Sequence, residues 1–254
     1  MKKHSLYIVL IFLFLFRQIA LAEYVEKDSV EKTFYIAPVE YNLNPKELIV
    51  PAGLITIGTI ASLTENYDIF NFSRSSNNPK STPLDDILQY STIPALFVFN
   101  LVAEEKHHPI DQFFLMALSY GITAVPVKLL KDNYEVLRPN GEAHSFPSGH
   151  TAKAFVGAHI IYKEFKDSNK IIAYSGYALG TATAVARIVH NKHWVADVLA
   201  GAGIAMLSTE LAYLIYFPIR NWMTEKANQK FGENTVIAPI VSPDAVGLQL
   251  KIRF

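Results

Sequence analysis

The sequence predicts an all-α protein built as a six-helix bundle. Two observations predict the bundle: half of the 254 residues are hydrophobic and only 18% are charged, and long apolar stretches alternate with short polar connectors. A third observation concerns the tail, where apolar and polar residues alternate one by one over 246–254, as in a β-strand. We therefore expect a signal segment over 1–22, a helical domain over 23–230 and a short β-hairpin tail over 231–254.

The first 22 residues have the features of an export signal. Lysines at positions 2 and 3 precede an apolar run over 6–16, and Ala-Leu-Ala at 20–22 places small residues where a signal peptidase would cleave. Because Arg17 interrupts the apolar character, an uncleaved membrane anchor is the alternative. In both cases we expect the chain after residue 22 to leave the cytoplasm.

Six apolar stretches follow, and each is long enough for a helix. They cover residues 48–63, 87–103, 110–130, 150–165, 171–189 and 194–219. Several contain about 16 uncharged residues, which is near the lower limit for a membrane span, so we expect association with a membrane. The last two stretches are rich in small residues. Gly176 and Gly180 share a helix face, and such faces allow helices to approach closely in membranes and in soluble bundles.

The tail is the one part of the chain with a strand pattern. Apolar side chains occupy every second position over 246–254, Ser-Pro-Asp at 242–244 is a turn signal, and 236–241 can supply the partner strand. We expect this hairpin to pack on the helical body.

Composition excludes several classes of partner and chemistry. Lys+Arg and Asp+Glu both total 23, so the formal net charge is zero and there is no electrostatic footprint for nucleic acid. The chain has no cysteine, which excludes disulfides, thiolate chemistry and cysteine-ligated zinc.

Three polar clusters lie at the ends of expected helices. The segment K-D-N-Y-E-V-L-R-P closes the third stretch with Lys131 and Arg138, P-S-G-H opens the fourth with Ser148, Gly149 and His150, and R-I-V-H-N-K-H-W-V-A-D joins the fifth to the sixth with Arg187, His193 and Asp197. We expect the three clusters to form one site at one end of the bundle.

These residue types suit the binding of a phosphate group. Lys131, Arg138 and Arg187 are permanent cations that could neutralise a phosphate dianion and the charge that develops during transfer. Ser148 falls where a helix N-cap belongs, and Gly149 would let an anion approach the backbone N–H groups beyond it.

The two histidines suit a covalent mechanism. His193 and Asp197 are four residues apart on one helix, so the carboxylate can reach one imidazole nitrogen, fix the tautomer and leave the other nitrogen bare to attack phosphorus. His150 then remains to protonate the leaving oxygen and later to activate water. No carboxylate cluster suggests a metal site, so we expect neither a metal nor another cofactor.

The three clusters resemble the signature of the type-2 phosphatidic acid phosphatase superfamily, which includes bacterial acid phosphatases, lipid phosphate phosphatases and vanadium haloperoxidases. Its pattern K-x6-R-P, P-S-G-H and S-R-x5-H-x3-D matches over 131–197, except that Ala186 stands where the family usually has serine. The resemblance implies a metal-independent phosphatase that forms a phosphohistidine. Catalysis then falls on His193, His150 and Asp197, and phosphate binding on Lys131, Arg138, Ser148, Gly149 and Arg187.

The expected substrate is a lipid phosphate, because the connector between Pro139 and Pro147 is too short for a large lid and the body is apolar. Candidates are phosphatidic acid, phosphatidylglycerol phosphate, undecaprenyl pyrophosphate and lipid A phosphate. The alternative is a soluble periplasmic acid phosphatase or phosphotransferase; the small chain disfavours a vanadate-dependent haloperoxidase. We expect the protein in the bacterial cell envelope, either in the inner membrane with the site facing the periplasm or periplasmic and membrane-associated.

Four more histidines are candidates for other roles. His144 and His190 lie beside the motifs and are candidates for contact with the substrate. The Glu-Glu and His-His pairs in the connector 104–109 could mimic a metal site. Their spacing matches no known ligand pattern, so we expect this connector to be a solvated loop.

Overall fold

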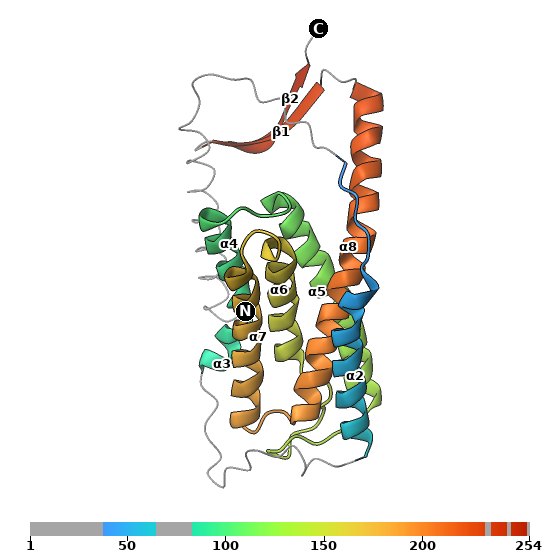
Figure 1. The fold of residues 1–254 in the computed structure, drawn as a ribbon, viewed down its shortest axis with the longest axis vertical. Coiled ribbons are helices and arrows are strands. Elements are labelled where there is room, and N and C mark those ends of the chain that lie inside the picture. Colours follow the sequence, from blue (N-terminus) through green and yellow to red (C-terminus); the bar gives the residue numbers. More distant parts are fainter. Residues whose placement is uncertain (1–37, 65–82, 232–234, 243–244, 253–254) are drawn as a thin grey trace. The chain divides into compact units, whose positions relative to one another are not determined.

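Helices make up most of the described part of the chain (Figure 1). The computed structural model describes residues 38–64, 83–231, 235–242 and 245–252. The all-α class is confirmed, whereas the expected signal segment over 1–22 lies outside the described residues. The chain divides into two compact units, one of residues 41–217 and one that combines 1–40 with 218–254.

Each of the six expected stretches contains a helix. The helices are η1 (Pro45–Leu48), α2 (Ile49–Leu63), α3 (Pro83–Leu88), α4 (Thr92–Val102), α5 (Pro109–Asn133), α6 (Gly149–Phe165), α7 (Lys170–Val189) and α8 (Val195–Phe231). Within the described residues, the short helices η1 and α3 come in addition to the six that the sequence predicts.

Polar side chains at the helix starts explain where several helices begin. Asn44 caps η1, and Asn169 caps α7 by accepting hydrogen bonds from two backbone N–H groups of its first turn. His108 caps α5, where its Nδ1 accepts from Ile110 N at 3.3 Å and a proline follows at the first helical position. These caps satisfy N–H groups that have no partner inside their own helix.

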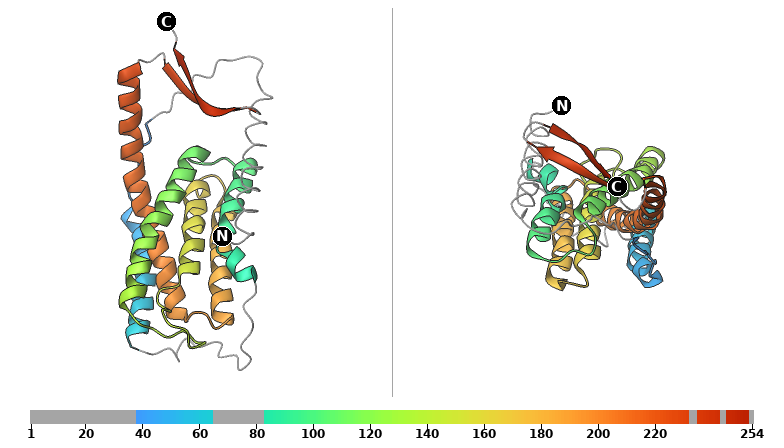
Figure 2. Two further views of the ribbon diagram at one scale, coloured as in Figure 1. Left: turned by 180° about the vertical axis from the view of Figure 1, so that it is seen from behind. Right: turned by 90° about the horizontal axis from the view of Figure 1, so that it is seen from above.

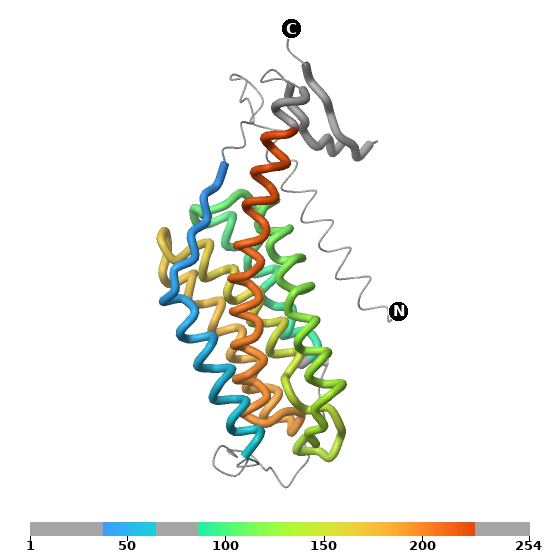
Figure 3. Tube along the Cα trace, turned by 90° about the vertical axis from the view of Figure 1, so that its right-hand side faces the viewer, coloured from blue at the N-terminus to red at the C-terminus, as the bar shows by residue number. Residues whose placement is uncertain are grey.

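Small residues let the helices of the 41–217 unit approach closely. A Cβ atom added to Gly176 of α7 would lie 3.0 Å from the backbone oxygen of Ala158 in α6, so the close approach expected for this face is confirmed. Likewise, a Cβ on Gly58 would lie 2.6 Å from the backbone oxygen of Ala196 in α8. Figure 3 shows α2 running beside the first part of α8, and Figure 2 shows the same bundle from behind and from above.

Three helices of the described part are long and apolar enough to cross a membrane: Pro45–Leu63, Pro109–Asn133 and Val195–Lys226. Within the apolar 18-residue window of each helix, only 22% of the first and of the second is buried, against 72% of the third. The side chains that the first two expose are large and apolar, such as Ile57, Ile60, Phe113 and Val125. Long helices with such exposed apolar side chains are typical of membrane proteins.

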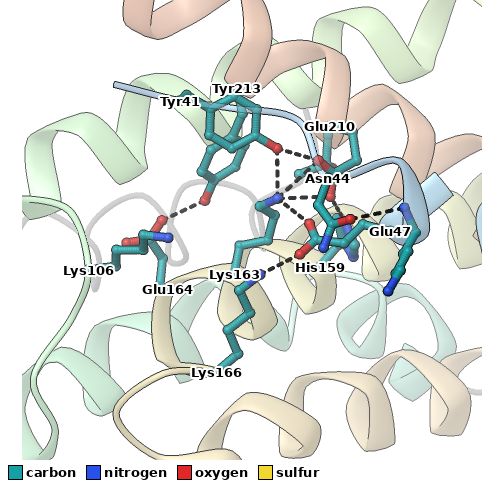
Figure 4. Close-up of polar contacts among 12 residues, drawn as sticks. Tyr41, Asn44, Glu47, Lys106, His159, Lys163, Glu164, Lys166, Glu210 and Tyr213 are labelled. Atoms are coloured by element: carbon teal, nitrogen blue, oxygen red, sulfur yellow. Dashed lines mark hydrogen bonds and ion pairs between the residues drawn. The ribbon is translucent and has the colours of Figure 1, made fainter. Parts of the chain in front are cut away.

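A buried polar network lies near the C-terminal end of α6 in the 41–217 unit (Figure 4). Lys163 Nζ donates to Tyr41 Oη and Glu47 Oε2 at 2.7 Å each, and to both carboxylate oxygens of Glu210 at 3.0 Å. His159 Nε2 lies 2.7 Å from Glu210 Oε1. The network joins the segment around η1 to α6 and α8, and removal of one partner would leave an uncompensated buried charge.

The connector 104–109 differs from its expectation. His107 is buried, with its Nδ1 2.9 Å from Glu164 Oε1, and its backbone N–H donates to Glu164 Oε2 at 2.9 Å. The expectation of a solvated loop is therefore wrong for His107. No local sequence pattern indicates this pair, because the partner carboxylate lies 57 residues away on α6.

The tail contains two strands, β1 (Thr235–Ser242) and β2 (Ala245–Ile252). They pair antiparallel, in a register that runs from Thr235 opposite Ile252 to Ser242 opposite Ala245. The packing of this pair on the helical body stays a prediction.

Candidate active site

The α5–α6 and α7–α8 connectors lie at the same end of the 41–217 unit, the lower end in Figure 1, and hydrogen bonds join them. Ser148 N donates to the backbone oxygen of Asp197 at 3.0 Å, and Trp194 Nε1 donates to the backbone oxygen of Leu137 at 2.7 Å. Ser145 Oγ donates to the Asp197 carboxylate. The structure thus brings the three sequence motifs together.

His193 is buried and paired with Asp197. Its Nδ1 lies 3.3 Å from Asp197 Oδ2, so Nδ1 carries the proton that faces the carboxylate and Nε2 is left with a lone pair. Burial lowers the pKa of His193 to about 4, although Asp197 acts in the opposite direction. The imidazole is therefore neutral near neutral pH, as a nitrogen nucleophile must be.

The local fold explains why Asp197 holds that position. Asp197 is the third residue of α8, and its Oδ2 accepts from the backbone N–H of Trp194 at 2.8 Å, just before the helix begins. A carboxylate that reaches back in this way satisfies one of the free N–H groups of the helix start. The chain arrives there through a tight turn in which Asn191 has a φ of 53°, a left-handed conformation that asparagine tolerates.

The α6 start has the N-cap that the sequence predicts. Ser148 is the N-cap residue, and its Oγ accepts from Thr151 N at 3.4 Å. A Cβ on Gly149 would meet nothing closer than Val127 Cγ1 at 3.8 Å, with Lys131 Cε at 4.0 Å. The first-turn N–H groups therefore open beside the ammonium-bearing side chain of Lys131, where an anion would meet both.

Lys131 is held in place by the α5–α6 connector. Its Nζ donates to the backbone oxygens of His144 at 2.7 Å and Ser145 at 3.3 Å, and His144 Nδ1 lies 2.7 Å from the backbone oxygen of Lys131. The charges of Arg138 and Arg187 act on this ammonium group, which places the three predicted cations around one point. His144 thus contacts Lys131 through both its ring and its backbone oxygen.

Arg138 is paired with a carboxylate that the motif does not include. Its Nη1 lies 2.6 Å from Glu142 Oε2, and Glu142 Oε1 lies 3.3 Å from Lys192 Nζ. Neither Glu142 nor Lys192 was singled out from the sequence. The available signals were the position of Glu142 four residues after Arg138 and that of Lys192 immediately before His193.

His150 lies in the first turn of α6, and its Nε2 is 3.1 Å from Asp86 Oδ1 of α3. Burial lowers the pKa of His150 below its ordinary value, the charge of Arg187 lowers it further, and Asp86 partly opposes both. The charge of Arg187 lowers the pKa of His193 as well, so both histidines lie within the electrostatic influence of Arg187. Asp86 was missed because it comes 64 residues earlier in the chain.

His190, the second neighbouring histidine, is half-buried at the C-cap of α7. Its backbone N–H donates to the Ala186 carbonyl at 3.0 Å, which closes the last turn of the helix. Contact of His190 with a substrate stays a prediction.

Part of the chain is similar to a known protein family. Residues 110–221 match the model of the PAP2 superfamily. A lipid A 1-phosphatase of Porphyromonas gingivalis is 39% identical over 100 residues, which are 39% of this chain and 22% of that protein. The match therefore spans about a fifth of the length of that relative.

Two solved structures are also similar to the chain. Aquifex aeolicus LpxE has 20% identity and a TM-score of 0.42, with 59% of this chain and 94% of that chain covered. A transmembrane PAP2 type phosphatidylglycerolphosphate phosphatase from Bacillus subtilis has 18% identity and a TM-score of 0.42, with 72% and 98% covered. The residues that match the PAP2 superfamily model, 110–221, contain the three motifs that meet at the α5–α6 and α7–α8 connectors.

Proposed function

We propose that the protein is a metal-independent phosphatase that hydrolyses a lipid phosphate monoester or pyrophosphate through a phosphohistidine on His193. The observation that carries this proposal is the buried pair of His193 and Asp197, which lies beside Lys131 and Arg187 and close to a helix N-terminus. A neutral imidazole with one nitrogen fixed by a carboxylate, set among cations, suits nucleophilic attack on a phosphate group.

In the first step, His193 Nε2 attacks phosphorus and the bond from phosphorus to the ester oxygen breaks. His150 gives its proton to the departing oxygen, which leaves as an alcohol or, from a pyrophosphate, as a phosphate. The positive charge that develops on the His193 ring is stabilised by Asp197 through Nδ1. The products of this step are a phosphohistidine and the released lipid.

In the second step, water attacks the phosphohistidine. The now neutral His150 takes a proton from the water, and the bond from phosphorus to Nε2 breaks to restore the His193 lone pair. Asp86, 3.1 Å from His150 Nε2, orients the ring and favours its protonated form before each turnover. Inorganic phosphate then leaves the site.

Lys131, Arg138, Arg187 and the N–H groups after Ser148 stabilise the equatorial oxygens of the phosphoryl group in both steps. Lys131 is fixed before the substrate arrives, because its ammonium group is hydrogen-bonded to the connector. Preorganised positive charge of this kind is a large part of phosphoryl-transfer catalysis.

Three observations support a lipid substrate. The described part of the chain has three helices apolar enough to span a membrane, and Leu137, next to Arg138, is exposed. The curated relative that matches 100 residues is a lipid A 1-phosphatase. Among phosphatidic acid, phosphatidylglycerol phosphate, undecaprenyl pyrophosphate and lipid A phosphate, we propose lipid A phosphate as the first candidate, which the similarity to this relative supports.

The site end of the bundle faces the periplasm in this proposal. The connector at the opposite end carries Lys166 and Lys170, and basic connectors favour the cytoplasmic side. Because the chain has no cysteine, single cysteines at Ala143 and at Asp167 would report sidedness. A membrane-impermeant maleimide added to intact spheroplasts should label the first position alone; labelling of the second alone contradicts the orientation.

The function is tested by a phosphate-release panel on the four lipids and on soluble esters, with purified protein in detergent. We expect release from at least one lipid, inhibition by vanadate, no effect of EDTA and no release by a His193→Ala variant. Release from soluble esters only would contradict the lipid substrate. Loss of activity in EDTA would contradict the metal-independent mechanism.

A further inference from the structure

The contact between Arg138 and Glu142 is built into the backbone of the α5–α6 connector. Arg138 N donates to the carbonyl oxygen of Glu142 at 2.8 Å, and Gly141 N donates to the carbonyl oxygen of Arg138 at 2.9 Å. Gly141 has a φ of 87°, which glycine adopts without the penalty that other residues meet. This turn folds Glu142 back so that its carboxylate reaches the guanidinium group at 2.6 Å.

Glu142 also bridges the two connectors of the site. Its second oxygen lies 3.3 Å from Lys192 Nζ, and Lys192 immediately precedes His193. The side chains of Arg138 and Lys192 are 22% and 20% exposed, whereas that of Glu142 is 52% exposed. The two cations are thus held mostly inside the protein, while the carboxylate between them has room to move.

Arg138 retains capacity for another acceptor. Its Nε is buried and has no hydrogen-bond partner among the described residues, although the guanidinium group can donate five hydrogen bonds. A carboxylate and a phosphate oxygen bind a guanidinium in the same geometry. Glu142 therefore takes up part of the donor set that a phosphate group would use.

We propose that Glu142 is an internal competitor for the phosphate group at Arg138, and that Lys192 holds the Glu142 carboxylate while phosphate is bound. When a substrate phosphate binds, Arg138 turns to it and Glu142 keeps its contact with Lys192. After hydrolysis, Glu142 returns to Arg138 and helps inorganic phosphate to leave. This inference rests on the proposed function, because it assigns Arg138 to phosphate binding.

Removal of the competitor should tighten phosphate binding. We expect Glu142→Gln to raise the affinity for orthophosphate about two- to fivefold, which corresponds to the loss of one partly exposed ion pair. The KM for a phosphate ester should fall by a similar factor, while kcat should not rise because product leaves more slowly. Glu142→Ala should shift the affinity in the same direction, and a fall in affinity in both variants contradicts the proposal.

The role of Lys192 follows from the sign of its coupling to Glu142. If Lys192 acts by holding the displaced carboxylate, Lys192→Met weakens orthophosphate binding in the wild type and weakens it less in the Glu142→Gln background. If Lys192 binds phosphate directly, Lys192→Met weakens orthophosphate binding more in the Glu142→Gln background than in the wild type, because Lys192 has no carboxylate partner in that background. The double-mutant cycle separates the two cases, and the second result overturns the assignment of Lys192.

The measurement is a 31P NMR titration of orthophosphate into the full chain purified in detergent. Asp132→Asn is the matched control: Asp132 is also 52% exposed and pairs with a cation four residues away, Lys128, at 2.6 Å. It should leave the orthophosphate affinity unchanged; an equal tightening would mean that net charge alone is responsible. The titration needs no turnover. If the protein hydrolyses none of the esters, the proposed function is contradicted, but the titration still shows whether Glu142 competes with orthophosphate.

Discussion

Replacement of Asp197 by asparagine tests how the carboxylate serves His193. Ser145 Oγ, Trp194 N and His193 Nδ1 all meet the same oxygen, Oδ2, and Oδ1 has no partner among the described residues. An asparagine can therefore turn its amide oxygen to these three donors and keep the His193 tautomer. What it removes is the negative charge that faces the ring when phosphorus bonds to Nε2.

The magnitude follows from the 3.3 Å between His193 Nδ1 and Asp197 Oδ2. Two unit charges at this distance interact by about 5 kcal/mol at an effective dielectric constant of about 20, and the amide dipole recovers part of that. We expect Asp197→Asn to lower kcat by about 10²–10⁴-fold, with KM nearly unchanged because the charge develops in the transition state.

The assay is single-turnover formation of the phosphoenzyme with an aryl phosphate, in Asp197→Asn and Asp197→Ala. The alanine variant should be slower still, since it also loses the tautomer and leaves Trp194 N without its acceptor. If the asparagine variant keeps more than about a tenth of the wild-type rate, the charge-stabilisation argument fails.

Three further predictions concern the same site. Burial lowers the pKa of His193 to about 4 and lowers the pKa of His150 from its ordinary range. The kcat/KM should therefore be highest at acidic pH, above the pKa of His193 and below that of His150: the nucleophile is protonated below this window and the acid is deprotonated above it. A pH profile that peaks well above 7 would contradict the assignments. His150→Ala should lower lipid-ester turnover by about 10²–10⁴-fold and lower the first step on nitrophenyl phosphate less, because that leaving group needs little protonation; equal losses in stopped-flow assays would argue against a general acid. Gly201→Ala should unfold the site, because its Cβ would lie 2.6 Å from Ser148 O; an unchanged melting temperature would show that α8 can shift.

The helices could be predicted because apolar stretches between polar connectors leave few other ways to bury side chains. Their boundaries were less accessible. The structure begins α4 at Thr92 and not near residue 87, since a turn in which Tyr90 N donates to the Ile87 carbonyl ends α3 first. Similarly, α8 continues to Phe231 beyond the apolar stretch, because charged residues are good helix formers and need no burial.

The motif residues were predictable because their spacing places them at the ends of apolar stretches. The same pattern therefore predicts both which residues form the site and where they lie on the helices. Asp86 of the short helix α3 and Glu142 of the α5–α6 connector were not predictable, since an exposed carboxylate has no sequence pattern of its own. The network around Lys163 and Glu210 was hidden for the same reason: its partners lie 47 residues apart, and each looks like an ordinary charged residue until the helices are packed.

We propose that His193 carries the phosphoryl group, and direct isolation of that intermediate tests this role. The protein would be mixed with a substrate labelled in the phosphoryl group, quenched in base during a single turnover, and digested for mass spectrometry. We predict an acid-labile phosphate on His193 that appears before free phosphate, and no phosphoenzyme in a His193→Ala variant. Hydrolysis by the wild type without a phosphohistidine, or a phosphoenzyme that persists in that variant, would contradict it.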